Sequence, residues 1–127
     1  PAQMKVFSMN EANDALAVVA PKLEAIQRLY ARLEVLKDDA KAAASASTAG
    51  GGMAGGTGYV NILYNIGKLT TEIAEMGIEL KDYSRGLIDF PHMKNGRVVF
   101  LCWQLGDGDE IEWWHETDAG FAGRQRL

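Results

Sequence analysis

Hydrophobic residues recur at alternating spacings of three and four positions in two stretches of the chain. The first stretch contains Leu16, Val19, Leu23, Ile26, Tyr30 and Leu33. This period places them on one face of an amphipathic helix, which we predict from about residue 9 to 41. Ser8 and Glu11 have the spacing of a capping box at its start. Pro21 removes one helical hydrogen bond, so we expect a kink or a restart there and not a loop.

The second helical stretch is shorter and predicts a helix from about residue 59 to 76. Its periodic residues are Ile62, Ile66, Leu69, Ile73 and Met76, and Gly77 follows as a left-handed stop. Between the helices, residues 42–58 are rich in glycine and alanine, which is typical of a flexible connector. Two such helices pack antiparallel as a hairpin spanning 9–76. Because the first helix is much longer, we expect part of its apolar face to be covered in a four-helix homodimer.

From Ile78 onward the hydrophobic period changes from helical to two, which predicts antiparallel strands. Asn95-Gly96 is a strong signal for a type I′ hairpin. Folding the chain there predicts one face made of Ile88, Phe90, His92, Val99, Leu101 and Trp103, and another made of Leu87, Asp89, Pro91, Phe100, Cys102 and Gln104. Pro91 indicates an edge strand. A further strand is predicted over 110–115.

These elements predict an α+β fold, with a long helical hairpin packed on a small antiparallel sheet (78–127) and an ordered C-terminal tail. We expect one domain over 1–127. The net charge of −4 argues against nucleic acid or an anionic membrane as a partner. The single cysteine, the short apolar runs and the lack of a signal-peptide pattern favour a cytoplasmic protein.

The segment "WHETD" contains the sharpest candidates for metal ligands, His115, Glu116 and Asp118. If the chain turns helically after Trp114, His115 and Asp118 lie on one face. One imidazole and one carboxylate fall short of the three protein ligands of a catalytic zinc site. Asp82, Asp89 or His92 would complete the set if the fold brings them near. The alternative, which we favour, is that His115 continues the face of Ile111 and Trp113 as a half-buried ring without a metal.

A second group of candidates consists of Asp82, Arg85, Asp89 and Arg124. Both arginines stand beside glycines and suit bidentate recognition of an anion, which favours a pocket for a small anionic ligand. The alternative, which we favour, is a polar latch in which internal ion pairs, such as Arg124 with Asp89, pin the tail to the sheet. Cys102 is interpreted as a buried, unreactive thiol, because the inferred register places no histidine beside it.

The segments "KVFS.NEAN", "KDYSRGLIDFP", "VFLCWQLG" and "WWHETDAGFAGRQ" resemble a small prokaryotic family catalogued as domain of unknown function 2203. The resemblance covers nearly the whole chain and implies the same fold, but no activity. The positions that match its motifs are Asp82, Arg85, Gly86, Asp89, Trp103, His115, Glu116, Asp118, Gly120, Gly123 and Arg124.

The sequence therefore indicates a small cytosolic protein of uncharacterised activity. Our first interpretation is a self-associating interaction or ligand-binding module, with a polar cluster formed by the C-terminal sheet and tail. The alternative is a divalent-metal-binding protein or a metal-dependent hydrolase that uses His115, Glu116 and Asp118. The residues do not decide whether the protein is an enzyme.

Overall fold

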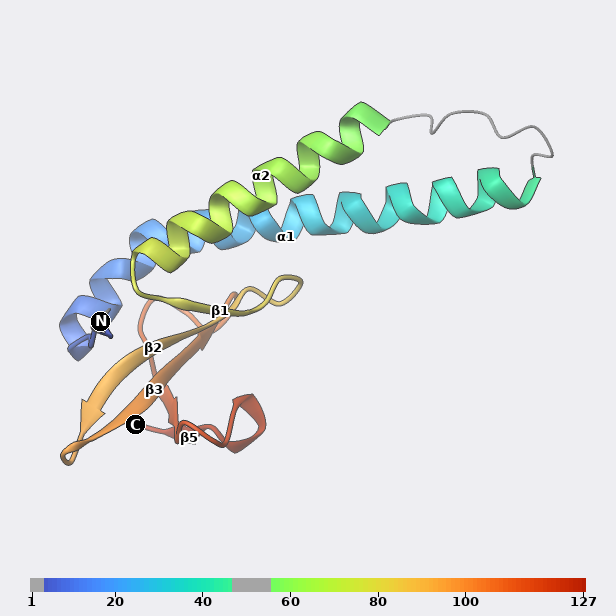
Figure 1. The fold of residues 1–127 in the computed structure, drawn as a ribbon. Coiled ribbons are helices and arrows are strands. Elements are labelled where there is room, and N and C mark those ends of the chain that lie inside the picture. Colours follow the sequence, from blue (N-terminus) through green and yellow to red (C-terminus); the bar gives the residue numbers. More distant parts are fainter. Residues whose placement is uncertain (1–3, 47–55) are drawn as a thin grey trace.

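Two helices lie side by side and form the predicted antiparallel hairpin (Figure 1). The computed structural model describes residues 4–46 and 56–127 of the chain. Helix α1 is Met9–Ala46 and helix α2 is Gly56–Glu75. Both helices extend into the predicted connector, since 42–46 and 56–58 are helical. The rest of that connector, residues 47–55, lies outside the described residues.

The helix boundaries follow the local signals in the sequence. Glu11 accepts a hydrogen bond from the Ser8 amide at 2.9 Å, and the Ser8 hydroxyl accepts one from the Glu11 amide at 3.0 Å, so the capping box is confirmed. Helix α1 continues through Pro21 without a loop. Gly77, with φ of 86°, ends α2, and the Ile78 amide donates to the Ile73 carbonyl at 3.4 Å.

Within the described part of the chain, five strands form an antiparallel meander in the order of the sequence. The strands are β1 (Glu79–Asp82), β2 (Leu87–Lys94), β3 (Arg97–Gln104), β4 (Trp113–His115) and β5 (Gln125–Arg126), with a 3-10 turn at Phe121–Gly123 before the last. Asn95 and Gly96 both have positive φ, as a type I′ turn requires. The predicted α+β fold is confirmed, although β4 is shorter than the predicted strand and β5 was not predicted as a strand.

The prediction that Pro91 marks an edge strand is wrong for β2 as a whole. Strand β2 pairs with β1 on one side and with β3 on the other. Pro91 is tolerated because β1 pairs only as far as Asp89, so no ladder bond from β1 is needed at Pro91. The segment before α1 lies beside β2 at this position, where the Phe7 amide donates to the Pro91 carbonyl at 2.7 Å.

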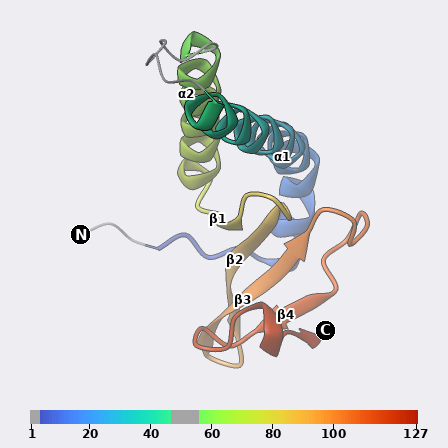
Figure 2. The ribbon, with the colours of Figure 1, turned by 90° about the vertical axis from the view of Figure 1, so that its right-hand side faces the viewer.

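The helices cover one face of the sheet, and Figure 2 shows the two layers. The register across the hairpin is the predicted one, with Ile88 opposite Trp103 and Phe90 opposite Leu101. These four side chains are buried in one cluster with residues of α1 and α2. We call this side of the sheet the inner face.

Helix α1 is longer than α2, and its first half packs against other parts of the same chain. Lys22 of α1 pairs with Glu72 of α2 at 2.7 Å, so the C-terminal end of α2 lies beside the first half of α1. The N-terminal part of α1, through Ala12 and Leu16, contributes to the core cluster formed with the sheet. The far end of the hairpin projects beyond the sheet (Figure 1). Neither helix, over the residues described, has the length and apolar character needed to cross a membrane.

Candidate metal centre

The face of the sheet opposite the helices carries a small group of buried polar residues. Since side chains alternate along a strand, Asp89 and Cys102 point away from the face formed by Ile88, Phe90, Leu101 and Trp103. Asp89 and Cys102 are direct partners across β2 and β3. We call this side the outer face. It brings together side chains from β2, β3 and β4, because β4 supplies His115.

Asp89, Cys102 and His115 form the candidate centre. One ligand-type atom from each, a carboxylate oxygen, the thiol sulfur and an imidazole nitrogen, lie within 4.8 Å of one another. Asp89 and His115 are each 2% exposed, and Cys102 is 0% exposed. His115 Nε2 and Asp89 Oδ1 are 3.0 Å apart. Three side chains of the types that can bind metals are therefore assembled out of contact with bulk water.

The orientation of the His115 ring is fixed by its other nitrogen. Nδ1 lies 2.7 Å from the Glu116 carbonyl oxygen, which can only accept, so Nδ1 carries a proton and donates it. Nε2 then faces Asp89 with a lone pair, and a carboxylate is also an acceptor. A positive charge, either a proton or a metal cation, must lie between these two atoms. Burial raises the pKa of Asp89. When no metal is bound, this shift favours a proton at the position between Asp89 and His115.

Cys102 is a protonated thiol in this environment. Burial and the nearby Asp89 carboxyl raise its pKa to about 11, although Arg124 opposes the shift. A thiol with such a pKa is a poor nucleophile at neutral pH, in keeping with the predicted unreactive cysteine. The expectation that no histidine lies near Cys102 was wrong, because β4 brings His115 to the same face as Cys102. The prediction had used only the register of the β2–β3 hairpin, and His115 lies on β4.

The C-terminal segment packs beside this centre. Arg124 donates to Asp107 Oδ2 at 2.9 Å, and both side chains are largely buried. Its guanidinium also lies 4.5 Å from the centre of the Trp113 ring and 4.4 Å from that of Phe121. The guanidinium of Arg85 also lies over the Phe121 ring, 4.0 Å from its centre. Cation–π contacts, the Arg124–Asp107 ion pair and the pairing of β5 with β4 therefore join the tail to the sheet.

The contacts of Arg124 and Asp89 differ from the ion pair suggested by the sequence. The carboxylate that pairs with Arg124 is Asp107, whereas Asp89 pairs with His115. Asp82 accepts hydrogen bonds from the amides of Ser84 and Arg85 at 2.9 Å, so it organises the turn between β1 and β2. These hydrogen bonds lower the pKa of Asp82.

Of the predicted metal ligands, His115 lies in the candidate centre and the other two do not. Glu116 forms an ion pair with Arg97, with its Oε1 3.0 Å from Nε. Asp118 is exposed. The residues that join His115 are Asp89 and Cys102, which the hairpin register had already placed on one face. What the sequence did not reveal is that β4 pairs with β3 at Phe100 and Cys102.

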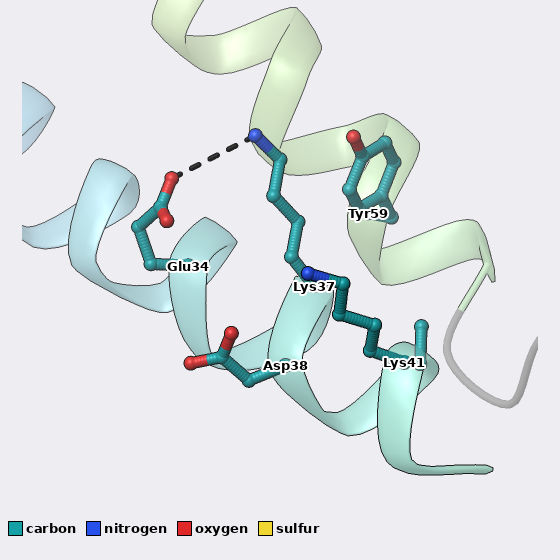
Figure 3. Close-up of a pocket in the computed structure, with 6 residues that line it drawn as sticks. Glu34, Lys37, Asp38, Lys41 and Tyr59 are labelled. Atoms are coloured by element: carbon teal, nitrogen blue, oxygen red, sulfur yellow. Dashed lines mark ion pairs between the residues drawn. The ribbon is translucent and has the colours of Figure 1, made fainter. Parts of the chain in front are cut away.

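A separate hollow of about 500 Å³ lies near the far end of the helical hairpin (Figure 3). Figure 3 labels Glu34, Lys37, Asp38 and Lys41 of α1 and Tyr59 of α2 around it. The charges are balanced, and Lys37 pairs loosely with Glu34 at 3.7 Å. Since Glu34, Lys37 and Asp38 are exposed to water, this hollow is a weaker candidate than the buried centre.

Comparison with known families agrees with the resemblance seen in the sequence. The chain belongs to the family described as "Uncharacterized conserved protein (DUF2203)", which matches residues 5–127. Comparison with curated proteins and with solved structures gives no match. The match shows that the family covers nearly the whole chain, and its description assigns no activity.

Proposed function

We propose that this protein binds a transition-metal ion, with Asp89, Cys102 and His115 as its ligands. The observation that carries the proposal is the convergence of the three ligand atoms within 4.8 Å in a buried position. This set revises the alternative suggested by the sequence, because His115 is retained while Asp89 and Cys102 replace Glu116 and Asp118.

The spacing of the ligand atoms fits a small metal ion. Nitrogen and oxygen ligands bind zinc at about 2.0–2.2 Å, so two of them lie roughly 3.3 Å apart in a tetrahedral site. Asp89 Oδ1 and His115 Nε2, 3.0 Å apart, need to separate only slightly. The hydrogen bond from Nδ1 to the Glu116 carbonyl is the kind of outer contact that orients a ligating histidine.

The chemistry of the three ligands favours zinc over magnesium or calcium. A thiolate and an imidazole are soft or borderline ligands, which suit zinc, whereas magnesium and calcium prefer oxygen alone. A divalent ion would balance the two negative charges of an ionised Asp89 and Cys102, so the occupied centre would carry no net charge. Three protein ligands leave a fourth position for water or another ligand, the arrangement found in catalytic zinc sites. Because the three ligands are almost entirely buried, the proposal is limited to binding.

Metal binding is tested by loading the purified, metal-free protein with Zn²⁺ or Co²⁺. We expect about one tightly held ion per chain by elemental analysis after dialysis. The Co²⁺ form should show a thiolate-to-metal charge-transfer band, which reports directly on Cys102. Cys102→Ser should abolish this band, and His115→Gln should weaken binding by more than the 10–100-fold typical of losing an outer-shell partner.

Matched variants separate this centre from the set suggested by the sequence. Glu116→Gln and Asp118→Asn change neighbouring carboxylates and should leave Zn²⁺ affinity within about threefold, since their side chains lie outside the cluster. His92→Gln controls for nonspecific binding by the other histidine. A wild-type protein that retains no metal would overturn the proposal. So would binding that survives loss of Cys102 and His115 but disappears with Asp118.

A further inference from the structure

The C-terminal tail, residues 119–127, lies against the outer face beside the candidate centre. Cys102 pairs with Trp113 across β3 and β4, so their side chains point to the same face. The Arg124 guanidinium lies over the Trp113 ring, 4.5 Å from its centre. Burial raises the pKa of the Cys102 thiol, and the same guanidinium is close enough to oppose this shift. Through Arg124, the tail therefore covers the centre on the side of Cys102.

The tail itself has little buried surface. None of the described residues 116–127 is buried, whereas all three residues of the centre are. The backbone of the tail joins the sheet through the pairing of β5 with β4 and through a hydrogen bond from the Leu127 amide to the Glu112 carbonyl at 2.9 Å. Segments with few buried apolar contacts open locally at a lower free energy than the core does. We therefore expect the tail to detach while the rest of the sheet stays folded.

A different opening of the centre would cost more. Asp89 and Cys102 lie directly opposite each other on β2 and β3, so parting these strands would also expose the sulfur. The same two strands carry Ile88 and Leu101, which are fully buried in the hydrophobic core between sheet and helices. Separating the strands would therefore disrupt the core, whereas detaching the tail breaks contacts near the surface only.

We propose that the tail controls the exchange of the metal ion, which reaches or leaves the centre when residues 119–127 detach from the sheet. The inference rests on the proposed metal site and adds the route by which the ion enters it. With the tail in place, Cys102 is 0% exposed, so an ion in solution cannot contact the sulfur. A step that must precede binding slows uptake and release alike. Loosening the tail should therefore speed both rates and leave the affinity nearly unchanged.

The single cysteine of the chain provides a test that needs no metal. In the metal-free protein, the rate at which Cys102 reacts with an aromatic disulfide reagent reports how often the centre opens. Phe121→Ala should speed this reaction about fivefold or more, since it removes the ring over which Arg85 and Arg124 lie. Arg124→Ala should speed it too, although losing a cation beside the sulfur would by itself slow a reaction of the thiolate. Gln125→Ala, an exposed position of the same tail, is the matched control and should change the rate by less than about twofold.

Global unfolding also exposes the thiol, and Ile88→Val separates it from local opening. This substitution removes one methylene from the inner face and lowers the urea midpoint of the whole fold. It should change the labelling rate by less than about twofold, because the tail is untouched. Equal acceleration by Ile88→Val and Phe121→Ala would show that the thiol is reached by unfolding, and this overturns the proposal. So does a labelling rate that neither Phe121→Ala nor Arg124→Ala increases.

The second arm measures the release of Zn²⁺ from the loaded protein to an excess of chelator. Phe121→Ala should speed release by about the same factor as labelling, with a Zn²⁺ affinity within about threefold of the wild type. Unchanged release from a protein that still binds Zn²⁺ overturns the role of the tail and leaves the metal site in place. A wild-type protein that binds no Zn²⁺ overturns the metal site, and with it metal exchange through the tail, even where labelling shows that the tail opens.

Discussion

Both faces of the sheet contain fully buried side chains, but these side chains differ in chemistry. On the inner face, Ile88, Phe90 and Leu101 are 0% exposed and belong to one hydrophobic cluster with residues of α1 and α2. On the outer face, Asp89, Cys102 and His115 are equally inaccessible, yet each is a polar or ionisable group. Burial by itself therefore does not distinguish a packing core from a site.

The difference lies in what each face needs from its neighbours. An apolar side chain is stabilised by any neighbour that excludes water and fills space, at roughly 25 cal/mol per Å² buried. A buried carboxyl or imidazole needs a partner at a specific position, or it costs about 1–3 kcal/mol. His115 has such partners at both nitrogens. The inner face is thus built for stability, and the outer face is built around the positions of particular atoms.

The largest effect is expected on the inner face. Phe90→Ala should lower the free energy of unfolding by about 3–5 kcal/mol, because it removes a large buried ring and leaves a cavity. Urea denaturation followed by circular dichroism measures this change. Met93→Ala, an exposed position on the same strand, is the control and should change stability by less than about 1 kcal/mol. A small loss for Phe90→Ala would mean that the inner face is not the main core.

A moderate effect is expected when one member of the outer-face pair is removed. Asp89→Ala should destabilise the metal-free protein by about 1–3 kcal/mol, because His115 Nε2 is left buried without its partner. Replacing both members with apolar residues, Asp89→Leu with His115→Phe, should cost less than Asp89→Ala alone or even stabilise the fold. Urea denaturation in the presence of a chelator compares the two. If the double variant is the less stable, the pair serves stability and not ligand binding.

The smallest effect is expected at Asp82, in the turn between β1 and β2. Its pKa is lowered in the folded protein by hydrogen bonds from Arg85 and Ser84. A carboxyl whose folded pKa is depressed contributes stability above its unfolded pKa, and this is lost as the pH falls through the folded pKa. The free energy of unfolding of the wild type should therefore exceed that of Asp82→Asn by less than about 1 kcal/mol at neutral pH, since solvent screens a partly exposed carboxylate. This difference in stability should disappear in acid, where Asp82 is protonated.

Urea midpoints measured from pH 7 to pH 3, roughly the range in which carboxylates titrate, check this prediction. Asp109→Asn, in an exposed loop, is the control. A gap between wild type and Asp82→Asn that grows as the pH falls would contradict the assigned role of Asp82 in the turn.

Much of the fold could be predicted because its signals are local. The capping box at Ser8, the glycine stop at residue 77 and the Asn95-Gly96 turn each act within a few residues of the chain. The hydrophobic period and this turn then predicted which residues of β2 and β3 lie on the inner face, and the structure has the predicted register. The error about the edge strand has a local origin too. Pro91 does lack a β1 partner, but β1 pairs with β2 just before it.

Less of the candidate centre could be predicted, because it depends on a contact between segments separated by a loop. The hairpin register places Asp89 opposite Cys102, and sequence alone provided that. The position of His115 depends on the pairing of β4 with Phe100 and Cys102 after residues 105–112, whose path is not periodic. The partner of Arg124 was missed for the same reason, since Asp107 lies in that loop.

The sequence by itself determined the two helices, the β hairpin and which strand positions face the helices, since hydrophobic period and turn residues act over short distances. Only the tertiary structure decided which polar side chains meet on the outer face. It placed Asp89, Cys102 and His115 together and directed Glu116 to Arg97. The physical reason is that apolar burial depends on pattern and area, whereas a hydrogen bond or a metal site requires atoms of distant segments to lie within about 3 Å of one another.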